Sequence, residues 1–162
     1  MHPDAKKLVE ALRLEPHPEG GFFRETFRAP FMLSALPHGG LRSAQTAILY
    51  LLPGGSVASL HCCRSDEVWH FYDGDPVELH LLDEEEHSIV RLGRDIAAGE
   101  VYQTVVPSGV WQAAVSTGSR FSLTGCTVAP GFEFDDFEMP SRAELQKRLP
   151  MHADLIAKLT KE

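Results

Sequence analysis

Short alternating runs of apolar and polar residues fill the middle of the chain, between Ala44 and Val128. They are rich in β-branched and aromatic residues and are separated by Gly, Pro and acidic residues: AILYLL, SVASLHCC, EVWHFY, PVELHLL, SIVRL, EVYQTVV, VWQAAV and RFSLTGCTVA. This pattern is typical of strands that bury one face, and the upstream segment FFRETFR (22–28) follows it too. Because no helix-length pattern separates the runs, the chain is predicted to form an all-β sandwich or barrel.

Both ends of the chain have helical periodicity instead. Residues 4–14 carry apolar side chains at helical spacing, which predicts a short amphipathic N-terminal helix. Near the other end, Ser141 and Glu144 form a Ser-x-x-Glu capping box that opens a second helical region. We therefore predict a barrel core at about 20–138 and a C-terminal helical tail at 140–161.

Length and charge narrow the class of protein. The chain has 162 residues, which suits a single domain over residues 1–162. Its formal net charge is -8, and it lacks the clustered Lys and Arg that nucleic acid or an anionic membrane would require. The apolar runs are far shorter than the roughly 20 residues that span a bilayer. The first residues include acidic side chains and no long apolar block, so we expect no signal peptide and a cytoplasmic location.

Candidate chemistry is concentrated in HCCRSDEVWHFYDG (61–74). Successive residues of a strand point to opposite faces, so Ser59, His61 and Cys63 should share one face. The short RSD connection makes the next strand a hairpin neighbour, and Glu67 can face the same interior as His61. The neighbouring thiols of Cys62 and Cys63 should point to opposite faces, and we expect free thiols.

Two large aromatic residues have the same strand phase as Glu67. Trp69 and Phe71 should therefore lie beside it, whereas His70 should point away. Aromatic rings next to a few convergent polar groups are typical of a small-molecule pocket. Their alternative role is packing in the core.

The spacing in this region resembles the first motif of the cupin superfamily, G-x5-H-x-H-x3-E-x6-G. Gly55, His61, Glu67 and Gly74 match it, and Cys63 stands where the second histidine would be. The second motif, G-x5-P-x-G-x2-H-x3-N, is similar to GEVYQTVVPSGVWQAAVS. In that segment the proline and second glycine match, the first glycine is two residues early, Gln112 occupies the histidine position and a serine replaces the asparagine.

Four stretches narrow the resemblance to one family of single-domain cupins of uncharacterised function, DUF985 or Cupin_5. They are HPEGGFFRETFR, SDEVWHFYDG, VVPSGVWQAA and TVAPGFEFDDFE. The resemblance implies a double-stranded β-helix, which is a jelly-roll barrel, and a homodimer. It implies no particular reaction.

Metal-binding cupins hold Fe, Mn, Ni or Zn with imidazoles and a carboxylate. Carried over to this sequence, the resemblance makes His61, Glu67 and Gln112 candidate ligands, with Cys63 available as a thiolate. In the alternative without a metal, His61 and Glu67 bond to each other and to the ligand. Cys63 would then be a small packing residue and Gln112 a satisfied amide.

The segment GGFFRETF is similar to the N-terminal segment of nucleotide-sugar 3,5-epimerases, which are metal-free cupins. In that family a barrel histidine takes a proton next to a keto group, and His61 occupies the matching position here. A histidine can perform this step because its pKa lies near neutrality, and Glu67 could hold its tautomer. The opposing acid is left open among Tyr50, Tyr72 and Tyr102.

The polar residues of FFRETFR divide between two faces. Glu25 shares a face with Phe23 and Phe27, which makes it a candidate for the pocket or for an ion pair in the core. Arg24 and Arg28 are assigned to a solvated or edge face. The phenylalanines of APGFEFDDF are expected to pack over one end of the barrel as a closing loop or lid. Five histidines are expected at the surface: His17, His38, His80, His87 and His152.

Three functional hypotheses result. The first is a protein that binds a small polar, carbohydrate-like metabolite and acts as an epimerase or isomerase through His61 and Glu67, without an obligatory metal. The second is a metal-dependent dioxygenase or isomerase with the same two residues as ligands, and the third is a non-catalytic sensor. The expected ligand contacts are Glu25, Cys63, Trp69, Phe71 and Gln112.

Overall fold

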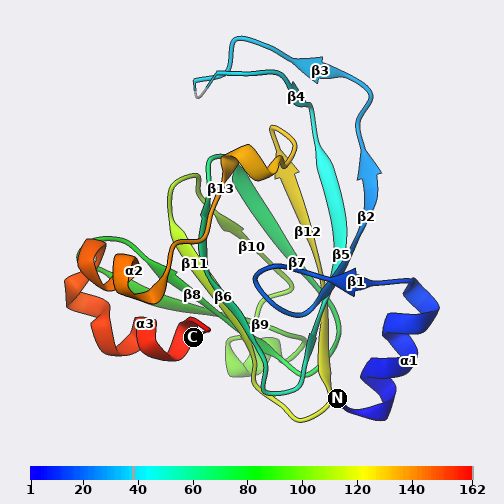
Figure 1. Ribbon diagram of the computed structural model, residues 1–162. Helices are drawn as coiled ribbons and strands as arrows, with labels where there is room; N and C mark the ends of the chain where they lie inside the picture. Colours follow the sequence, from blue (N-terminus) through cyan, green and yellow to red (C-terminus); the bar gives the residue numbers. More distant parts are fainter. Residues whose placement is uncertain (38, 162) are drawn as a thin grey trace.

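The computed structural model describes residues 1–37 and 39–161, so the expected surface position of His38 lies outside the described residues. Two antiparallel sheets face each other and form the body of the molecule (Figure 1). The strand order is β1-β2-β5-β12-β7-β10 in one sheet and β13-β6-β11-β8-β9 in the other, and β3 and β4 form a hairpin that projects beyond the barrel. The strands are β1 (Glu15–Pro16), β2 (Phe22–Arg28), β3 (Met32–Leu33), β4 (Arg42–Ser43), β5 (Thr46–Pro53), β6 (Val57–Cys63), β7 (Asp66–Gly74), β8 (Val77–Leu82), β9 (His87–Leu92), β10 (Gln103–Val106), β11 (Trp111–Ser116), β12 (Phe121–Ala129) and β13 (Phe137–Glu138).

The helices cover the outer faces of the two sheets, as the terminal periodicity predicts. Helix α1 (Pro3–Leu12) packs Ala5 against the larger sheet, and α2 (Arg142–Arg148) and α3 (Ala153–Leu159) pack over the smaller one. The predicted capping box is confirmed, because Ser141 and Glu144 satisfy each other's backbone N–H groups at the start of α2. Three short 3-10 helices are η1 (Ile96–Ala98), η2 (Phe134–Asp136) and η3 (Pro150–His152). None of the helices in the described ranges combines the length and apolar character needed to cross a bilayer.

The space between the sheets is filled by apolar side chains. Trp69 is 1% exposed and Phe71 is buried beside it, while Tyr72 on the same strand faces solvent. This alternation along β7 matches the phase predicted from the sequence. Tyr50 and Leu52 of β5 belong to this central core, together with inward residues of other strands of both sheets.

Two β-bulges shift the phase of strands that border the barrel end. In β2 the register shifts between Glu25 and Phe27, so Thr26 is an extra residue. In β6 the pairs Gln112–His61 and Ala114–Ala58 leave two β6 residues opposite one residue of β11, and Ser59 is one of the two. The prediction that Ser59 shares the face of His61 therefore does not hold.

A histidine pair lies on the outer face of the smaller sheet beside the C-terminal tail, with one member buried and the other, His87, exposed. His80 is buried and its Nδ1 lies 3.0 Å from Nε2 of His87. Burial, followed by the neighbouring His87, lowers the pKa of His80. The third histidine of this group, His152, lies beside His87 and contacts the carbonyl oxygen of Asp83. The expectation that His80 is a surface residue is wrong, because the tail covers this face of the sheet.

Candidate functional site

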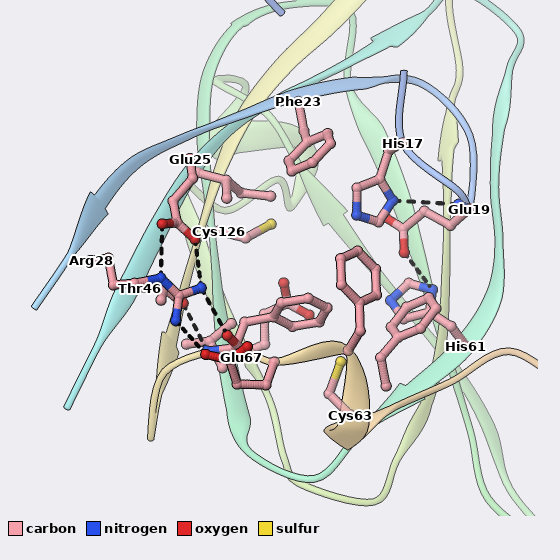
Figure 2. Close-up of a pocket in the computed structure, with 16 residues that line it drawn as sticks. His17, Glu19, Phe23, Glu25, Arg28, Thr46, His61, Cys63, Glu67 and Cys126 are labelled. Atoms are coloured by element: carbon pink, nitrogen blue, oxygen red, sulfur yellow. Dashed lines mark hydrogen bonds and ion pairs between the residues drawn. The ribbon is translucent and has the colours of Figure 1, made fainter. Parts of the chain in front are cut away.

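A pocket of about 110 Å³ lies at the end of the barrel from which the β3–β4 hairpin projects. Its lining comes from β2, β5, β6, β7, β12, the turn before β2 and the η2 segment (Figure 2). The sequence-predicted residues His61, Glu67, Glu25 and Cys63 all line it. Four predicted residues from three strands, β2, β6 and β7, thus meet in one cavity.

A buried polar pair in the pocket consists of His61 and Glu19. Nδ1 of His61 lies 2.8 Å from the carbonyl oxygen of Ser59 and 3.0 Å from Oε2 of Glu19, and both side chains are at most 7% exposed (Figure 2). The sequence predicted Glu67 as the group that fixes the tautomer of His61. The structure gives that position to Glu19, because the turn before β2 folds back across the start of β6.

Two glycines let this turn approach the barrel. A Cβ on Gly20 would come within 2.6 Å of the Val57 carbonyl oxygen, and one on Gly21 equally close to the Leu51 carbonyl oxygen. Both glycines have positive φ, which L side chains rarely adopt. The hydroxyl of Tyr50, a residue of the barrel core, donates a hydrogen bond to the carbonyl oxygen of Gly20 at 2.6 Å. This bond fixes the turn to the barrel.

The pair is ionised because its two members stabilise each other's charges. Burial alone would lower the pKa of His61, but the Glu19 carboxylate outweighs it and raises that pKa to about 9. Burial likewise opposes the charge of Glu19, and His61 overcomes it, so the pKa of Glu19 is lowered. At neutral pH the pocket therefore holds an imidazolium and a carboxylate in contact.

His17, which is expected at the surface, lies beside this pair, with Nδ1 3.6 Å from Oε1 of Glu19. Its side chain is only 8% exposed, lines the pocket and packs edge-on against the ring of Phe23. Burial lowers the pKa of His17, and the nearby Glu19 only partly offsets this effect. His17 therefore favours the neutral form, whereas His61 favours the charged one.

Glu67 is held by two successive hydrogen bonds that link it through Gln112 to Trp69 in the core. Nε1 of Trp69 donates to Oε1 of Gln112 at 2.9 Å, and Nε2 of Gln112 donates to Oε2 of Glu67. Burial is the main reason that the pKa of Glu67 is raised. Both ends of the Gln112 amide therefore have protein partners. Its oxygen, the atom that would bind a metal ion, accepts a hydrogen bond from Trp69, and Gln112 does not line the pocket.

The aromatic walls of the pocket differ from the predicted ones. Trp69 and Phe71 belong to the central core and are not part of the pocket lining in the described chain. The rings of Phe132 and Phe137, from the segment expected to close the barrel, line the pocket instead. The ring centroid of Phe137 lies 5.3 Å from that of His61. Strand phase places Trp69 and Phe71 inside the barrel, but it does not distinguish the packed centre from the open end.

The mouth of the pocket carries a three-residue ion network. Nη2 of Arg28 lies 2.8 Å from Oε2 of Glu25, and Nη1 lies 2.6 Å from Oε1 of Glu133. The β2 bulge explains why Arg28 lines the pocket with Glu25 while Phe27, 49% exposed, turns outward. Arg28 is exposed, as its assignment to a solvated face expects, but the bulge places it on the same face as Glu25 rather than on the opposite one.

Three residues of the pocket have the donor types that bind divalent metal ions. His61, Cys63 and Glu67 each offer one ligand atom, and these atoms all lie within 4.8 Å of one another. Nδ1 of His61 is engaged by Ser59 and Glu19, so Nε2 is the nitrogen available to a ligand. Burial raises the pKa of the Cys63 thiol, and Cys63 is a thiol unless a cation displaces its proton. The donor set therefore fits a metal with three protein ligands.

The three candidate tyrosines lie in different places. Tyr72 and Tyr102 are more than half exposed on the outside of the barrel. Tyr50 is fully buried beneath the turn that carries Glu19, and its hydroxyl is bonded to that turn. Burial, followed by Glu19, raises the pKa of Tyr50 well above its usual value.

Comparison with known proteins identifies relatives of this chain. The family model Cupin_5, described as cupin superfamily (DUF985), matches residues 6–140. An uncharacterized protein of Saccharomyces cerevisiae, YML079W, is 29% identical over 81% of this chain and 72% of its own length. A solved structure of a hypothetical protein from Leishmania major is 30% identical, covers 98% of this chain and 99% of its own, and has a TM-score of 0.91. The protein SO0799 from Shewanella oneidensis is 35% identical, covers 99% and 98%, and has a TM-score of 0.87.

More distant solved structures support the fold alone. Oxalate decarboxylase from Bacillus subtilis aligns with 91% of this chain and 37% of its own at 15% identity, with a TM-score of 0.58. A protein from Klebsiella pneumoniae described as having a double-stranded β-helix domain aligns with a TM-score of 0.55. The predicted all-β jelly-roll barrel with terminal helices is confirmed.

Proposed function

The chain belongs to the Cupin_5 family of the cupin superfamily (DUF985), and we propose that it is an isomerase-type enzyme that moves a proton on a small carbonyl-bearing metabolite. The observation that carries this proposal is the buried contact between Nδ1 of His61 and Oε2 of Glu19 at 3.0 Å. A carboxylate in contact with Nδ1 keeps a proton on that nitrogen, so Nε2 is the nitrogen that can exchange a proton with the ligand.

The charge states of His61 and Glu67 assign them the roles of acid and base. His61 is an imidazolium at neutral pH, so its Nε2–H is a donor for a carbonyl oxygen that gains negative charge. His61 already carries its proton, so Glu67 is the residue of the two that can act as the base, and burial raises its pKa and with it its basicity. This assignment reverses the part of base that the sequence resemblance gave to His61.

The proposed reaction is an enolisation. The Glu67 carboxylate takes the proton from the carbon next to the carbonyl, and the C–H electron pair forms the carbon–carbon double bond of an enol. The carbonyl oxygen takes the Nε2 proton of His61. The carbon that lost its proton carries a hydroxyl in such a substrate, so the intermediate is an enediol. Glu67 then delivers its proton to the former carbonyl carbon, and the hydroxyl of the adjacent carbon gives its proton to Nε2 of His61, so that the carbonyl moves to that carbon with no net change in protons.

The shape of the pocket favours a substrate with a polar end and a flat apolar face. The polar groups His61, Glu67 and Cys63 lie together, and the rings of Phe23 and Phe137 also line the cavity. Sugars and related metabolites have this combination, and their apolar faces stack on aromatic rings. A carbohydrate-like compound with a free carbonyl is therefore the substrate class we propose.

Turnover of a panel of aldoses, ketoses and sugar nucleotides by wild type, His61→Gln and Glu67→Gln tests the proposal. We expect wild type to isomerise at least one compound and each variant to lose about 100-fold or more in kcat/KM. His70→Gln is the matched control, because His70 lies on the outer face of β7 with its Nε2 3.0 Å from Oγ1 of Thr127. It should stay within about twofold of wild type. Binding without turnover would contradict the enzyme and favour a sensor.

A metal-dependent enzyme is the second candidate, and the three converging ligand atoms favour it. His61, Cys63 and Glu67 would hold the ion, while Glu19 and Gln112 already orient two of these ligands from behind. A bound divalent ion would act as a Lewis acid on a substrate oxygen. The nitrogen, sulfur and oxygen donors suit zinc or a similar borderline ion.

Metal content separates the two candidates. Elemental analysis of protein purified without an affinity tag would support the second candidate at about one equivalent of metal and contradict it below about a tenth of an equivalent. Added Co²⁺ should give a sulfur-to-cobalt absorption band in wild type that is absent in Cys63→Ser. Cys62→Ser is the control, because this neighbouring thiol does not line the pocket. A band that survives Cys63→Ser would exclude Cys63 as the ligand.

A further inference from the structure

A second cleft, of about 710 Å³, lies on the other side of the turn that carries Glu19. It is bounded by Pro18 of that turn, by β6 and by the beginning and end of the C-terminal tail, which lies along this side of the barrel (Figure 1). Within the described chain, none of its lining residues also lines the barrel pocket. The cleft is therefore a separate space that shares one wall with the candidate active site.

An unpaired hydroxyl lies in the wall of this cleft. Ser59 is 5% exposed, and its Oγ makes no hydrogen bond to any residue in the described ranges. The β6 bulge places Ser59 and Leu60 together opposite Ala113, and both residues line the cleft. A buried hydroxyl without a partner is unfavourable, so this position is suited to a ligand that can accept a hydrogen bond from it.

Two of the described residues that line the cleft are cationic, in a protein whose net charge is -8. Arg142 and Lys161 line it, and none of the lining residues described by the structure is acidic. The Arg142 guanidinium is oriented by Thr160, with Nε 2.9 Å from Oγ1 and Nη2 2.9 Å from the carbonyl oxygen. Nζ of Lys161 lies against Gly20, at 2.9 Å from where a Cβ would be. Two cations and a hydroxyl donor favour an anionic ligand.

Ser59 also connects the cleft to the His61–Glu19 pair. Its backbone N–H donates to the carbonyl oxygen of Glu19 at 2.8 Å, and its carbonyl oxygen contacts Nδ1 of His61 at 2.8 Å. A ligand that binds the Ser59 hydroxyl would therefore act on the residue that holds both members of the pair.

We propose that this cleft binds a phosphate-type oxyanion through the Ser59 hydroxyl, Arg142 and Lys161, and that its occupancy is sensed by the His61–Glu19 pair. The oxyanion is either free phosphate or the phosphate group of a small metabolite. Phosphate accepts several charge-assisted hydrogen bonds at once, which matches the donors that the cleft presents. The site goes beyond the proposed isomerase, because its binding function does not require turnover.

Calorimetric titration with inorganic phosphate, glucose 6-phosphate and glucose at constant ionic strength tests the site. We expect saturable binding of the two phosphate compounds and none of glucose. Tighter binding of glucose 6-phosphate would identify a metabolite as the source, and equal or weaker binding would identify free phosphate. Absence of saturable binding of both would overturn the proposal.

Matched variants locate the bound anion. Ser59→Ala and Lys161→Gln should each weaken binding about tenfold, and Lys158→Gln, an exposed lysine of α3 outside the cleft, should change it less than about twofold. Ser59→Ala removes an unpaired hydroxyl, so its melting temperature should not fall, which separates lost binding from unfolding. Equal losses in both lysine variants would indicate unspecific attraction and overturn the proposal.

Two further outcomes decide whether the anion binds in the cleft and is coupled to the pair. His61→Gln should still bind phosphate, and loss of binding in this variant would place the anion in the barrel pocket and overturn the proposal. In wild type, saturating phosphate should shift the NMR signals of the His61 ring and of the Glu19 amide. Unchanged signals would overturn the coupling.

Discussion

At the scale of single residues, Glu19 decides what His61 can do. Burial alone would favour a neutral imidazole, as it does for the neighbouring His17. The carboxylate of Glu19 at 3.0 Å reverses this preference and holds His61 as a cation. The same histidine is then a proton donor rather than a base, and the nearby Glu67 is the group left to accept a proton.

The stability of the protein should depend on pH through this pair. The pKa of His61 is raised from 6.5 to about 9, so the stabilisation from its charged form is complete below pH 6.5 and is lost as the pH rises through about 9. Between these values the free energy of unfolding of wild type should fall by up to about 3 kcal/mol relative to His61→Gln. Urea unfolding of both proteins across this pH range measures the difference in the free energy of unfolding. A difference that stays constant with pH would contradict the prediction.

Substitution of Glu19 should change the pH dependence of the reaction. Glu19→Gln keeps the size of the side chain but removes the charge that raises the pKa of His61, so activity should fall about tenfold or more. The alkaline limb of kcat/KM should also move to lower pH, because His61 loses its proton earlier. A profile with the wild-type alkaline limb would show that Glu19 does not control His61.

The alternation of side chains along a strand explains which site residues could be predicted from the sequence. The alternation of β6 and β7 places His61, Cys63 and Glu67 in one pocket without knowledge of the fold. Glu19 could not be found in this way, because it lies in a turn and reaches His61 only through a long-range contact. The pair of glycines that follows it was the available signal, since such glycines mark a close approach of the backbone.

At the scale of elements, the two bulges and the η2 segment shape the pocket. The bulge in β2 brings Arg28 to the pocket, and the bulge in β6 turns Ser59 toward the second cleft. A one-residue shift of this kind cannot be predicted from alternation, because it changes the phase without changing the composition. The phenylalanines of the segment expected to close the barrel, Phe132, Phe134 and Phe137, line the pocket at that end.

The β3–β4 hairpin should help to fix the η2 segment. Arg42 on β4 donates to both carboxylate oxygens of Asp136, at 2.6 and 2.8 Å, and both side chains are nearly buried. Arg42→Gln should therefore lower the melting temperature and raise KM for the substrate. Thermal unfolding and steady-state kinetics measure the two effects.

Arg91→Gln is the control for that variant. Arg91 pairs with Glu78 at 3.4 Å in an exposed position far along the smaller sheet, so its loss should cost less than about 1 kcal/mol. Equal effects of the two arginine substitutions would show that the hairpin does not support the pocket through Arg42.

At the scale of the whole molecule, the barrel was the most predictable feature. Many short alternating runs without intervening helices leave few folds other than a sandwich or barrel. The terminal helices follow from periodicity and from the capping box at Ser141. The depth at which a side chain lies along the barrel is set by three-dimensional packing, which explains why Trp69 and Phe71 lie in the core and not at the pocket wall.

The homodimer implied by the family resemblance is a prediction at this scale. A chain of 17.9 kDa should elute with about twice that mass in size-exclusion chromatography with light scattering. The mass should not change on dilution through the micromolar range. A mass equal to that of one chain would contradict it.

Exchange of substrate hydrogen with solvent tests the proton-transfer proposal most directly. Wild type incubated in D₂O with the carbohydrate panel should introduce deuterium at the carbon next to the carbonyl of its substrate, as detected by mass spectrometry, because Glu67 takes that proton and returns another. His61→Gln and Glu67→Gln should exchange at least about 100-fold more slowly, and His70→Gln at the wild-type rate. Exchange that persists unchanged in both pocket variants, or its absence with every compound in wild type, would contradict the proposed acid and base.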